Sequence, residues 1–389
     1  METVKGFRDI TGSEAEIREE VKKLLVETFK RYGYESVETP IIEQEEFVKK
    51  SGDANDEAIS DVYTLKDRGE RKLALRYEFT FQLKRLMVNK KLPYKRYQIG
   101  EVFRDEPTTS GKQRYRQFTQ CDADIVSSTI KDEADLFGLV CEVLDKLGIK
   151  YEVSINTRKL LNEILDQYKI DDKTKPYVLR EIDKLDKFPE SEVVKNLKTM
   201  KAQDVLKTLN GNESTFKIFK SYTDIIELKK LCDIYGIKFK FSPTLARGLS
   251  YYNGTVFEIK TLDKDFKETI CAGGAYLVNG IQSFGVSFGL DRLCSLVDEK
   301  TFDKVKSKIM VISIGQEKEA INLVKKLREK GNRVELMYDK VSKALDYSNS
   351  KKFDKVIFVG EEEVKKKKFK IKDMVSGKEI WKSEKDLMK

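Results

Sequence analysis

Two strand-like runs, residues 94–104 and 114–125, constrain this chain most, because the loop between them is too long for an ordinary hairpin. Hairpin loops usually have about two to five residues, and longer loops are usually functional. Residues 105–113 exceed that length. The two runs therefore predict neighbouring antiparallel strands that carry a functional loop at one end.

Alternate residues of the second run share one face of the strand. That face changes from cationic through aromatic and amide to acidic side chains: Arg114, Arg116, Phe118, Gln120, Asp122 and Asp124. At about 3.3 Å per residue it spans on the order of 30 Å, enough for a ligand with phosphates at one end and a cationic group at the other. Guanidinium groups suit phosphates, and a phenyl ring offers a stacking surface. A solvated edge hairpin with alternating charge is the alternative.

The absence of histidine restricts the chemistry of all 389 residues. It excludes a Ser-His-Asp system, a histidine-ligated zinc and an imidazole general base. Carboxylates, arginine, lysine, tyrosine or a metal held by acids must act instead. The 75 basic and 66 acidic residues leave a net charge of +9, which suits an anionic partner such as nucleic acid. The lysines are dispersed, however, as on an ordinary solvated surface.

The five cysteines are widely spaced and form no C-x-x-C pair, which argues against a zinc ribbon or a disulfide framework. They are Cys121, Cys141, Cys232, Cys271 and Cys294. No run approaches the roughly eighteen apolar residues needed to span a bilayer, and the first ten residues do not resemble a signal peptide. These patterns predict a cytoplasmic protein with reduced thiols and no membrane span.

The length predicts two to three domains at about 150 residues each. Strands with packed helices are expected over residues 1–156, and helical periodicity replaces strand patterns over 157–237. Strand patterns resume over 238–303 and are expected to share a sheet with the first block. Residues 306–389 then predict a small α/β domain.

Helical spacing of apolar residues predicts helices over 14–32, 131–147 and 290–297. Ser13 and Glu16 have the spacing of a capping box before the first of these. Beyond residue 300 strands and helices alternate, with segments expected at 308–314, 317–330, 333–338, 342–352 and 355–359.

Four segments carry a family resemblance. EVFRDEPTTSGKQRYRQFTQCDAD, residues 101–124, resembles motif 2 of a class II aminoacyl-tRNA synthetase of the histidyl-tRNA synthetase kind. LRYEFT at 75–80 resembles the amino-acid-binding segment of that family. LARGLSYYNGTVFE at 245–258 resembles its histidine-specific signature, and FGLDRL at 288–293 resembles motif 3. Matches this nearly contiguous are far more specific than a lone glycine pattern.

The resemblance implies an α/β fold: an α+β catalytic domain with an antiparallel sheet and helices, a helical insertion, and a C-terminal α/β anticodon-binding domain with a mixed sheet. It also implies a class II, AMP-forming histidine–tRNA ligase. Such an enzyme activates L-histidine with ATP to histidyl-adenylate and transfers it to the 3′-hydroxyl of the terminal adenosine of tRNA-His.

The resemblance assigns the ATP-binding residues. Arg104 would bind the α-phosphate and Glu106 the adenine amino group. Phe118 would stack on adenine, while Arg292 would cover its other face and reach the γ-phosphate. Arg114 would reach the outer phosphates. Mg²⁺ would bridge those phosphates without a dedicated protein site, with carboxylates as its ligands.

The histidine-binding set implied by the resemblance is Glu78, Thr80, Gln120, Asp124, Arg247, Tyr251, Tyr252 and Tyr276. The first three would hold the α-ammonium group. Asp124 and Tyr252 would hold the two imidazole nitrogens. Arg247 would lie against the α-phosphate opposite Arg104, which makes Arg104, Arg247 and Arg292 the catalytic residues.

Two departures from the family pattern bear on the pocket. The family usually has G-G-R-Y-D where this chain reads Gly273, Gly274, Ala275, Tyr276 and Leu277. An arginine and an acid are therefore missing beside the pocket. Asp124 also stands where many members carry the longer glutamate.

The implied partners are tRNA-His, L-histidine, ATP and a second copy of the chain. The helix from Ser13 and the segment through Pro40 resemble motif 1, which builds the homodimer interface of the class. The lysine run at 365–368 lies in the domain that resembles an anticodon-binding domain, although such a run is also typical of an exposed surface. Candidates to read an extra 5′ guanosine on the tRNA are Thr108, Thr109, Ser110, Lys112 and Gln113.

Two other functions are considered. One is a non-catalytic regulatory subunit of ATP phosphoribosyltransferase, but those paralogues lack the C-terminal domain and typically lose the histidine signature. The other is an RNA-binding protein with a decayed active site, against which Arg104, Arg247 and Arg292 argue.

Overall fold

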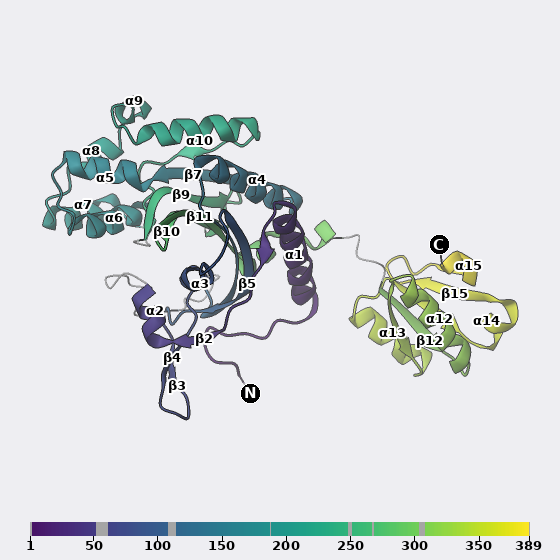
Figure 1. Cartoon of the computed structure of the whole chain (residues 1–389). Coiled ribbons are helices and arrows are strands. Elements are labelled where there is room, and N and C mark those ends of the chain that lie inside the picture. The colour runs from purple at the N-terminus through teal and green to yellow at the C-terminus, as the bar shows by residue number, and fades with distance from the viewer. Residues whose placement is uncertain are drawn as a thin grey trace. The chain divides into compact units, whose positions relative to one another are not determined.

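The computed structural model describes residues 2–51, 61–107, 114–186, 188–247, 251–266, 268–302 and 308–388. Two compact units divide the chain, Met1–Thr301 and Phe302–Lys389, and Figure 1 shows both. Among the described residues, no helix combines the length and apolar character that a membrane crossing needs. The five cysteines lie in the described part of the chain, where all are buried and none forms a disulfide.

An eight-stranded sheet forms the centre of the first unit, in the order β1-β5-β6-β11-β10-β9-β7-β8. Its strands are β1 (Glu35–Ser36), β5 (Tyr94–Phe103), β6 (Gln117–Val126), β7 (Tyr151–Thr157), β8 (Lys240–Phe241), β9 (Tyr252–Thr261), β10 (Thr269–Val278) and β11 (Ile281–Gly289). The inner strands pair antiparallel, whereas β1 and β8 pair parallel at the two edges. Because β6 pairs with β11, the two sequence blocks share one sheet, as expected.

The start predicted for the second strand is wrong. β6 begins at Gln117, so Arg114 and Arg116 precede it and residues 104–116 connect the two strands. The Arg116 carbonyl still accepts a 2.9 Å hydrogen bond from the Arg104 amide, but the Arg116 amide donates to the Gly6 carbonyl near the N-terminus, also at 2.9 Å. The Arg116 amide is therefore bonded to the N-terminal segment rather than to the strand beside it.

Helices cover one face of the sheet and leave the other for polar side chains. The covering helices are α1 (Gly12–Arg31), α4 (Ile130–Lys146) and α11 (Leu290–Leu296), and α1 contacts both others. Phe137 of α4 stacks edge-on against Phe257 of β9, with ring centres 4.7 Å apart. Along β6, Cys121, Ala123 and Ile125 are fully buried on this face. The period of two places Gln120, Asp122 and Asp124 on the opposite face, called the site face below.

The predicted capping box of α1 is wrong, although the helix itself is confirmed. The helix begins at Gly12 with Thr11 as its N-cap, and no side chain caps it. Ser13 therefore lies inside the first turn and cannot take the capping position. The apolar stripe behaves as predicted, with Val21, Leu25 and Phe29 fully buried.

Between β7 and β8, all the regular elements of the described residues are helices, joined by turns. Residue 187 lies outside the described residues. The helices are α5 (Arg158–Gln167), α6 (Lys175–Asp183), α7 (Glu190–Thr199), α8 (Val205–Leu209), α9 (Glu213–Phe216) and α10 (Tyr222–Ile234), with one 3-10 turn. Figure 1 shows them gathered beside β7, and α10 packs on α4.

A small sheet lies next to the site face. It contains β2 (Ile42–Gln44), β4 (Lys72–Leu75) and β3 (Thr64–Lys66), flanked by α2 (Glu45–Ser51). The following helix α3 (Thr80–Leu86) packs Leu83 against Tyr252 and Tyr276 of the main sheet. This contact positions residues 75–80 beside the strands of the site face.

The second unit is a mixed five-stranded sheet in the order β13-β12-β14-β15-β16. The predicted alternation is confirmed by β12 (Lys308–Ser313), α12 (Glu317–Glu329), β13 (Arg333–Met337), α13 (Val341–Ser350) and β14 (Lys355–Val359). Elements beyond the prediction are α14 (Glu361–Lys366), β15 (Lys368–Asp373), β16 (Glu379–Ser383) and α15 (Glu384–Leu387). The lysine run thus ends α14, where Lys365 pairs with Glu361.

Glu133 on α4 yields a prediction about stability and pH. Burial raises the pKa of this carboxyl to about 7 from its ordinary 4.5, while the Thr255 hydroxyl and the Lys159 charge oppose the rise. Between these two pKa values the folded protein binds more protons than the unfolded chain, so raising the pH lowers the free energy of unfolding. Through this group the protein should lose up to about 3 kcal/mol between about pH 4.5 and pH 7.

Urea unfolding at several pH values checks this prediction. Glu133→Gln cannot ionise, so its free energy of unfolding should fall less over the same interval. Equal pH slopes for the two proteins would contradict the assignment.

Candidate active site

A buried ion pair anchors one end of the site face. Arg96 of β5 and Asp124 of β6 are cross-strand neighbours, and Arg96 Nη2 lies 2.8 Å from Asp124 Oδ2. Arg96 is fully buried and also donates to the Phe79 carbonyl at 3.2 Å. The Tyr276 hydroxyl donates to the other carboxylate oxygen. One oxygen of Asp124 is therefore ion-paired with Arg96, and the other accepts the hydrogen bond from Tyr276.

The electrostatic balance at Asp124 follows from these contacts. Burial raises the pKa of its carboxyl, whereas the Arg96 charge and the Tyr276 hydrogen bond favour the ionised form. Burial also raises the pKa of Tyr276 well above its ordinary value, which keeps the phenol a donor. The position of the carboxylate requires glycine beside it, since a Cβ at Gly285 would stand 2.1 Å from Asp124 Oδ1.

Aromatic and polar side chains continue the pocket from Asp124. The Tyr251 ring centre lies 4.9 Å from that of Tyr252 and 5.7 Å from that of Tyr276. The Tyr251 hydroxyl donates to the buried Glu78 at 3.3 Å and is also hydrogen-bonded to Thr80 at the start of α3. These contacts bring together residues predicted to bind histidine from β9, β10, the start of α3 and the segments just before α3 and β9.

A group of arginines lies at the cationic end of the site. The Arg104 guanidinium is 4.3 Å from the Tyr77 ring centre and 5.1 Å from that of Phe118. Glu106 lies 3.9 Å from Arg104 and 3.7 Å from Arg114. Burial lowers the pKa of Arg292, and the charges of Arg114 and Arg104 lower it further. Such mutual repulsion is relieved when an anion binds among them.

Arg247 joins this group through a chain of polar contacts. Its guanidinium pairs with Glu258, which accepts a 3.2 Å hydrogen bond from the Thr269 hydroxyl. The Thr269 carbonyl in turn accepts a 2.7 Å hydrogen bond from Arg292. Burial lowers the pKa of Arg247, but Tyr252 and Glu258 outweigh it and the net shift is upward. Arg247 also has φ = +61°, a left-handed conformation that is rare outside glycine.

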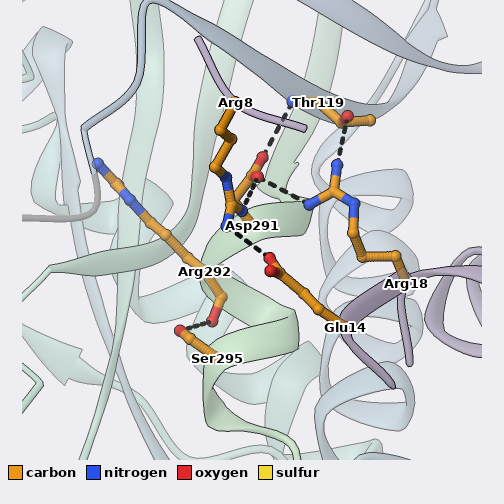
Figure 2. Close-up of polar contacts among 7 residues, drawn as sticks. All are labelled: Arg8, Glu14, Arg18, Thr119, Asp291, Arg292 and Ser295. Atoms are coloured by element: carbon orange, nitrogen blue, oxygen red, sulfur yellow. Dashed lines mark hydrogen bonds and ion pairs between the residues drawn. The ribbon is translucent and has the colours of Figure 1, made fainter. Parts of the chain in front are cut away.

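Asp291 connects the motifs that carry these side chains. One of its oxygens accepts from Arg18 of α1 at 2.7 Å and from Arg8 at 3.0 Å, and the other accepts from the Thr119 amide of β6 at 3.1 Å. Figure 2 shows these contacts converging on Asp291, while the side chain of its neighbour Arg292 extends away from them. The start of α11 is thereby fixed against β6 and α1.

Comparisons with known proteins agree over the full chain. A family model described as Histidyl-tRNA synthetase matches residues 6–293, and one described as Anticodon binding domain matches residues 308–389. Histidine–tRNA ligase 1 of a Bacillus cereus strain is 32% identical, with 98% of this chain and 97% of that protein covered.

The chain belongs to the histidyl-tRNA synthetase family. Histidine–tRNA ligase of Wolinella succinogenes is also 32% identical, with 96% of this chain and 94% of that protein covered. The crystal structure of histidyl-tRNA synthetase from Nostoc sp. PCC 7120 has a TM-score of 0.83 at 21% identity, over 99% of this chain and 98% of that one. This likeness confirms the predicted fold class, including the C-terminal mixed sheet.

A second solved structure shares the fold without separating two functions. It is titled as an ATP phosphoribosyltransferase regulatory subunit/histidyl-tRNA synthetase from Bacillus halodurans C, with a TM-score of 0.76 at 20% identity over 92% of this chain and 97% of that one. At that identity the likeness concerns the fold alone.

Several predictions for this family site fall outside the described residues. The candidates to read a 5′ guanosine lie outside the described residues: Thr108, Thr109, Ser110, Lys112 and Gln113. Residues 248–250 of the histidine signature do so as well. Within the described residues, the structure brings Arg104, Arg114 and Arg292 together at one end and Asp124 with Tyr276 at the other.

The departures at Ala275 and Leu277 lie on the opposite face from the pocket. Both alternate with Tyr276 along β10, so the strand period directs them away from the site face. Ala275 is buried opposite Phe284, while Leu277 is 47% exposed. The expectation that they lie beside the pocket is wrong, because it compared positions in sequence without the alternation of the strand.

Sequence reasoning missed Arg96 and Asp291. Arg96 is an arginine in the middle of a predicted strand, and its cross-strand partner depends on the register of the β5–β6 pair. Asp291 stands inside FGLDRL, next to the predicted Arg292. Its partners come from segments more than a hundred residues away, so no local pattern could name them.

Asp291→Ala should reduce the free energy of unfolding by about 3–5 kcal/mol, because it leaves the buried Arg18 without its counter-charge. Chemical denaturation measures this loss. Glu142→Ala is the control, since it breaks the exposed pair of Arg31 and Glu142 and should cost at most about 1 kcal/mol. Equal losses in the two variants would show that Asp291 is not an anchor.

Arg96→Leu should destabilise the fold by a similar amount, about 3–5 kcal/mol, because Asp124 then remains buried without its cation. Adding Asp124→Leu should recover part of that loss, since two apolar groups can replace a buried pair. Denaturation of the two single variants and the double variant forms the cycle. Additive losses would contradict the coupling of the two side chains.

Proposed function

We propose that this chain is a histidine–tRNA ligase in which Arg104, Arg247 and Arg292 stabilise the reacting phosphate and Asp124 recognises the imidazole ring. The observation that carries the proposal is the convergence of arginines from three distant segments next to a pocket that contains a buried, arginine-paired acid. Its membership of the histidyl-tRNA synthetase family supports the same reaction.

The first step requires no protein nucleophile. The carboxylate of histidine attacks the α-phosphorus of ATP in line, and pyrophosphate leaves. Catalysis then depends on holding the reactants in place and on cationic groups near the developing charge. Arg104 and Arg247 would contact the α-phosphate, with Arg114 and Arg292 on the outer phosphates. A chain without histidine can perform this chemistry because guanidinium groups suffice.

Selectivity for histidine would come from hydrogen bonds between the imidazole ring and buried polar side chains of the pocket. Arg96 and the Tyr276 hydroxyl favour an ionised Asp124, which can accept an N–H of the imidazole ring. Tyr252 would meet the other ring nitrogen. An amino acid that cannot form these hydrogen bonds would leave buried polar groups unsatisfied, which penalises its binding strongly.

Magnesium would enter with the phosphates of ATP. The described residues contain no group of three or more side chains suited to hold a metal. Mg²⁺ usually keeps one or two protein carboxylates besides phosphates and water. We propose Glu268 as a carboxylate ligand, because its charge acts on Arg292 at the cationic end of the site. The ion would neutralise charge on the departing pyrophosphate.

The second step transfers histidine to the 3′-hydroxyl of the terminal adenosine of tRNA-His. We assign residues 306–389 to the anticodon, in line with the matching domain family, and residues 157–237 to the acceptor stem. The catalytic domain then comprises residues 1–156 and 238–303. We also propose a homodimer built through α1 and the segment to Pro40, and a cytoplasmic location.

Two features support a ligase over a regulatory subunit of ATP phosphoribosyltransferase. The anticodon-binding family matches residues 308–389, and an anticodon-binding domain serves tRNA recognition. The histidine signature is present, with Tyr251 and Tyr252 placed against Glu78 and Tyr276.

Arg247→Ala should abolish histidine-dependent exchange of labelled pyrophosphate into ATP, because it removes one of two cations from the α-phosphate. Binding of tRNA-His in a filter assay should remain nearly intact. Lys240→Ala is the control for loss of one positive charge, since Lys240 is exposed on β8, and it should exchange normally.

Equal loss of exchange and tRNA binding in Arg247→Ala would mean that Arg247 is misplaced. Absence of histidine-dependent exchange in the unmodified protein would sink the proposed function itself.

A further inference from the structure

Gln120, Ser287 and Asp122 form a hydrogen-bonded chain across two strands of the site face. Gln120 Nε2 lies 3.0 Å from Ser287 Oγ, and the Ser287 hydroxyl is hydrogen-bonded to the Asp122 carboxylate. The register of β6 and β11 pairs Asp122 with Ser287 and Gln120 with Gly289. The three side chains therefore lie together on one face, and Asp122 is buried.

The direction of the hydrogen bonds among Gln120, Ser287 and Asp122 follows from the protonation state of the Asp122 carboxyl group. The ionised form of the Asp122 carboxylate, which the Arg96 charge and the Ser287 hydrogen bond favour, can only accept. With that form present, the one hydroxyl hydrogen of Ser287 points to Asp122. Ser287 can then only accept a hydrogen bond from Gln120. Gln120 must present its NH₂ group to Ser287, and its carbonyl Oε1 must face the other way.

Within the described part of the chain, the side-chain carbonyl of Gln120 is left without a hydrogen-bond donor. Among the described residues, Gln120 Oε1 is buried and has no hydrogen-bond partner. The surroundings are acidic, since the charges of Asp124 and Glu78 both act on Asp122. A buried carbonyl in acidic surroundings fits a cationic N–H donor such as an ammonium group.

We propose that Asp122 and Ser287 are positioning residues, which set the orientation of the Gln120 amide so that the site selects a ligand with an α-ammonium group. This rests on the proposed function, which places the α-ammonium of histidine at Gln120. Selection of the ammonium group depends on these hydrogen bonds. Without them, either the carbonyl oxygen or the NH₂ group of the Gln120 amide could turn toward the ligand.

The location of Asp122 fits this role better than a packing role. Burial and, after it, the charge of Asp124 raise the pKa of Asp122 to about 7, against the opposing effects of the Arg96 charge and the Ser287 hydrogen bond. A buried acid beside another acid lowers the stability of the fold, so a role in packing alone does not explain its presence. An amide of the same size would pack equally well but could donate to Ser287, and this would release the orientation of Gln120.

Two ligands separate the positioning role from a structural one. L-histidine carries the ammonium group, and 3-(imidazol-4-yl)propanoate is the same molecule without it. Dissociation constants for both are measured by calorimetry on the full chain. For the unmodified protein, we expect histidine to bind more tightly. In Asp122→Asn and in Ser287→Ala, the affinity for histidine should fall about tenfold while that for the propanoate stays unchanged.

Glu133→Gln is the matched control, because it neutralises another buried acid of raised pKa outside this chain of hydrogen bonds. It should leave both affinities unchanged. Ser287→Ala removes only one oxygen, so it tests the inference even if Asp122→Asn fails to fold.

Three results would overturn the inference. Equal weakening of both ligands by Asp122→Asn or Ser287→Ala would indicate a structural role, and unchanged affinities would indicate no role. An unmodified protein that binds both ligands equally would show no selection by the ammonium group. If that protein also lacks histidine-dependent pyrophosphate exchange, the proposed function fails with it, whereas exchange with unselective binding overturns only the inference.

Discussion

The site depends on one buried carboxylate, that of Asp291. It accepts hydrogen bonds from Arg8, Arg18 and the Thr119 amide, so it ties the N-terminal segment and α1 to β6 and α11. A buried acid requires such partners, and loss of the acid leaves a buried cation without its counter-charge. The same residue lies next to Arg292, so the contact that joins the layers also positions the side chain for which we propose a phosphate-binding role.

A second constraint is the balance of buried charge on the site face. Asp122 and Asp124 are both buried, and burial raises the pKa of each. Arg96, which is buried beside them, opposes that rise and favours the ionised form of each. At the other end burial lowers the pKa of Arg292, and the positive charges of Arg114 and Arg104 lower it further. An acidic end and a basic end on one sheet match an amino acid joined to a nucleotide.

Much of this could be predicted from the sequence, and the failures have physical causes. The strand pair was predictable because its residues alternate and its neighbours lie close along the chain. The start of β6 was not, because the Gly6 carbonyl competes for the Arg116 amide from more than a hundred residues away. The predicted capping box of α1 was wrong because helix boundaries are set by backbone hydrogen bonds, which a pattern of residue types does not contain.

The sequence by itself determined the family, the alternation of strands and helices over residues 308–359 and the residue types available for catalysis, because those depend on local periodicity and on contiguous motifs. Only the tertiary structure decided the pairing of Arg96 with Asp124, the three contacts of Asp291, and the face on which Ala275 and Leu277 lie. These depend on strand register and on contacts between distant segments. A shift of one residue in register would turn every side chain of a strand to the other face.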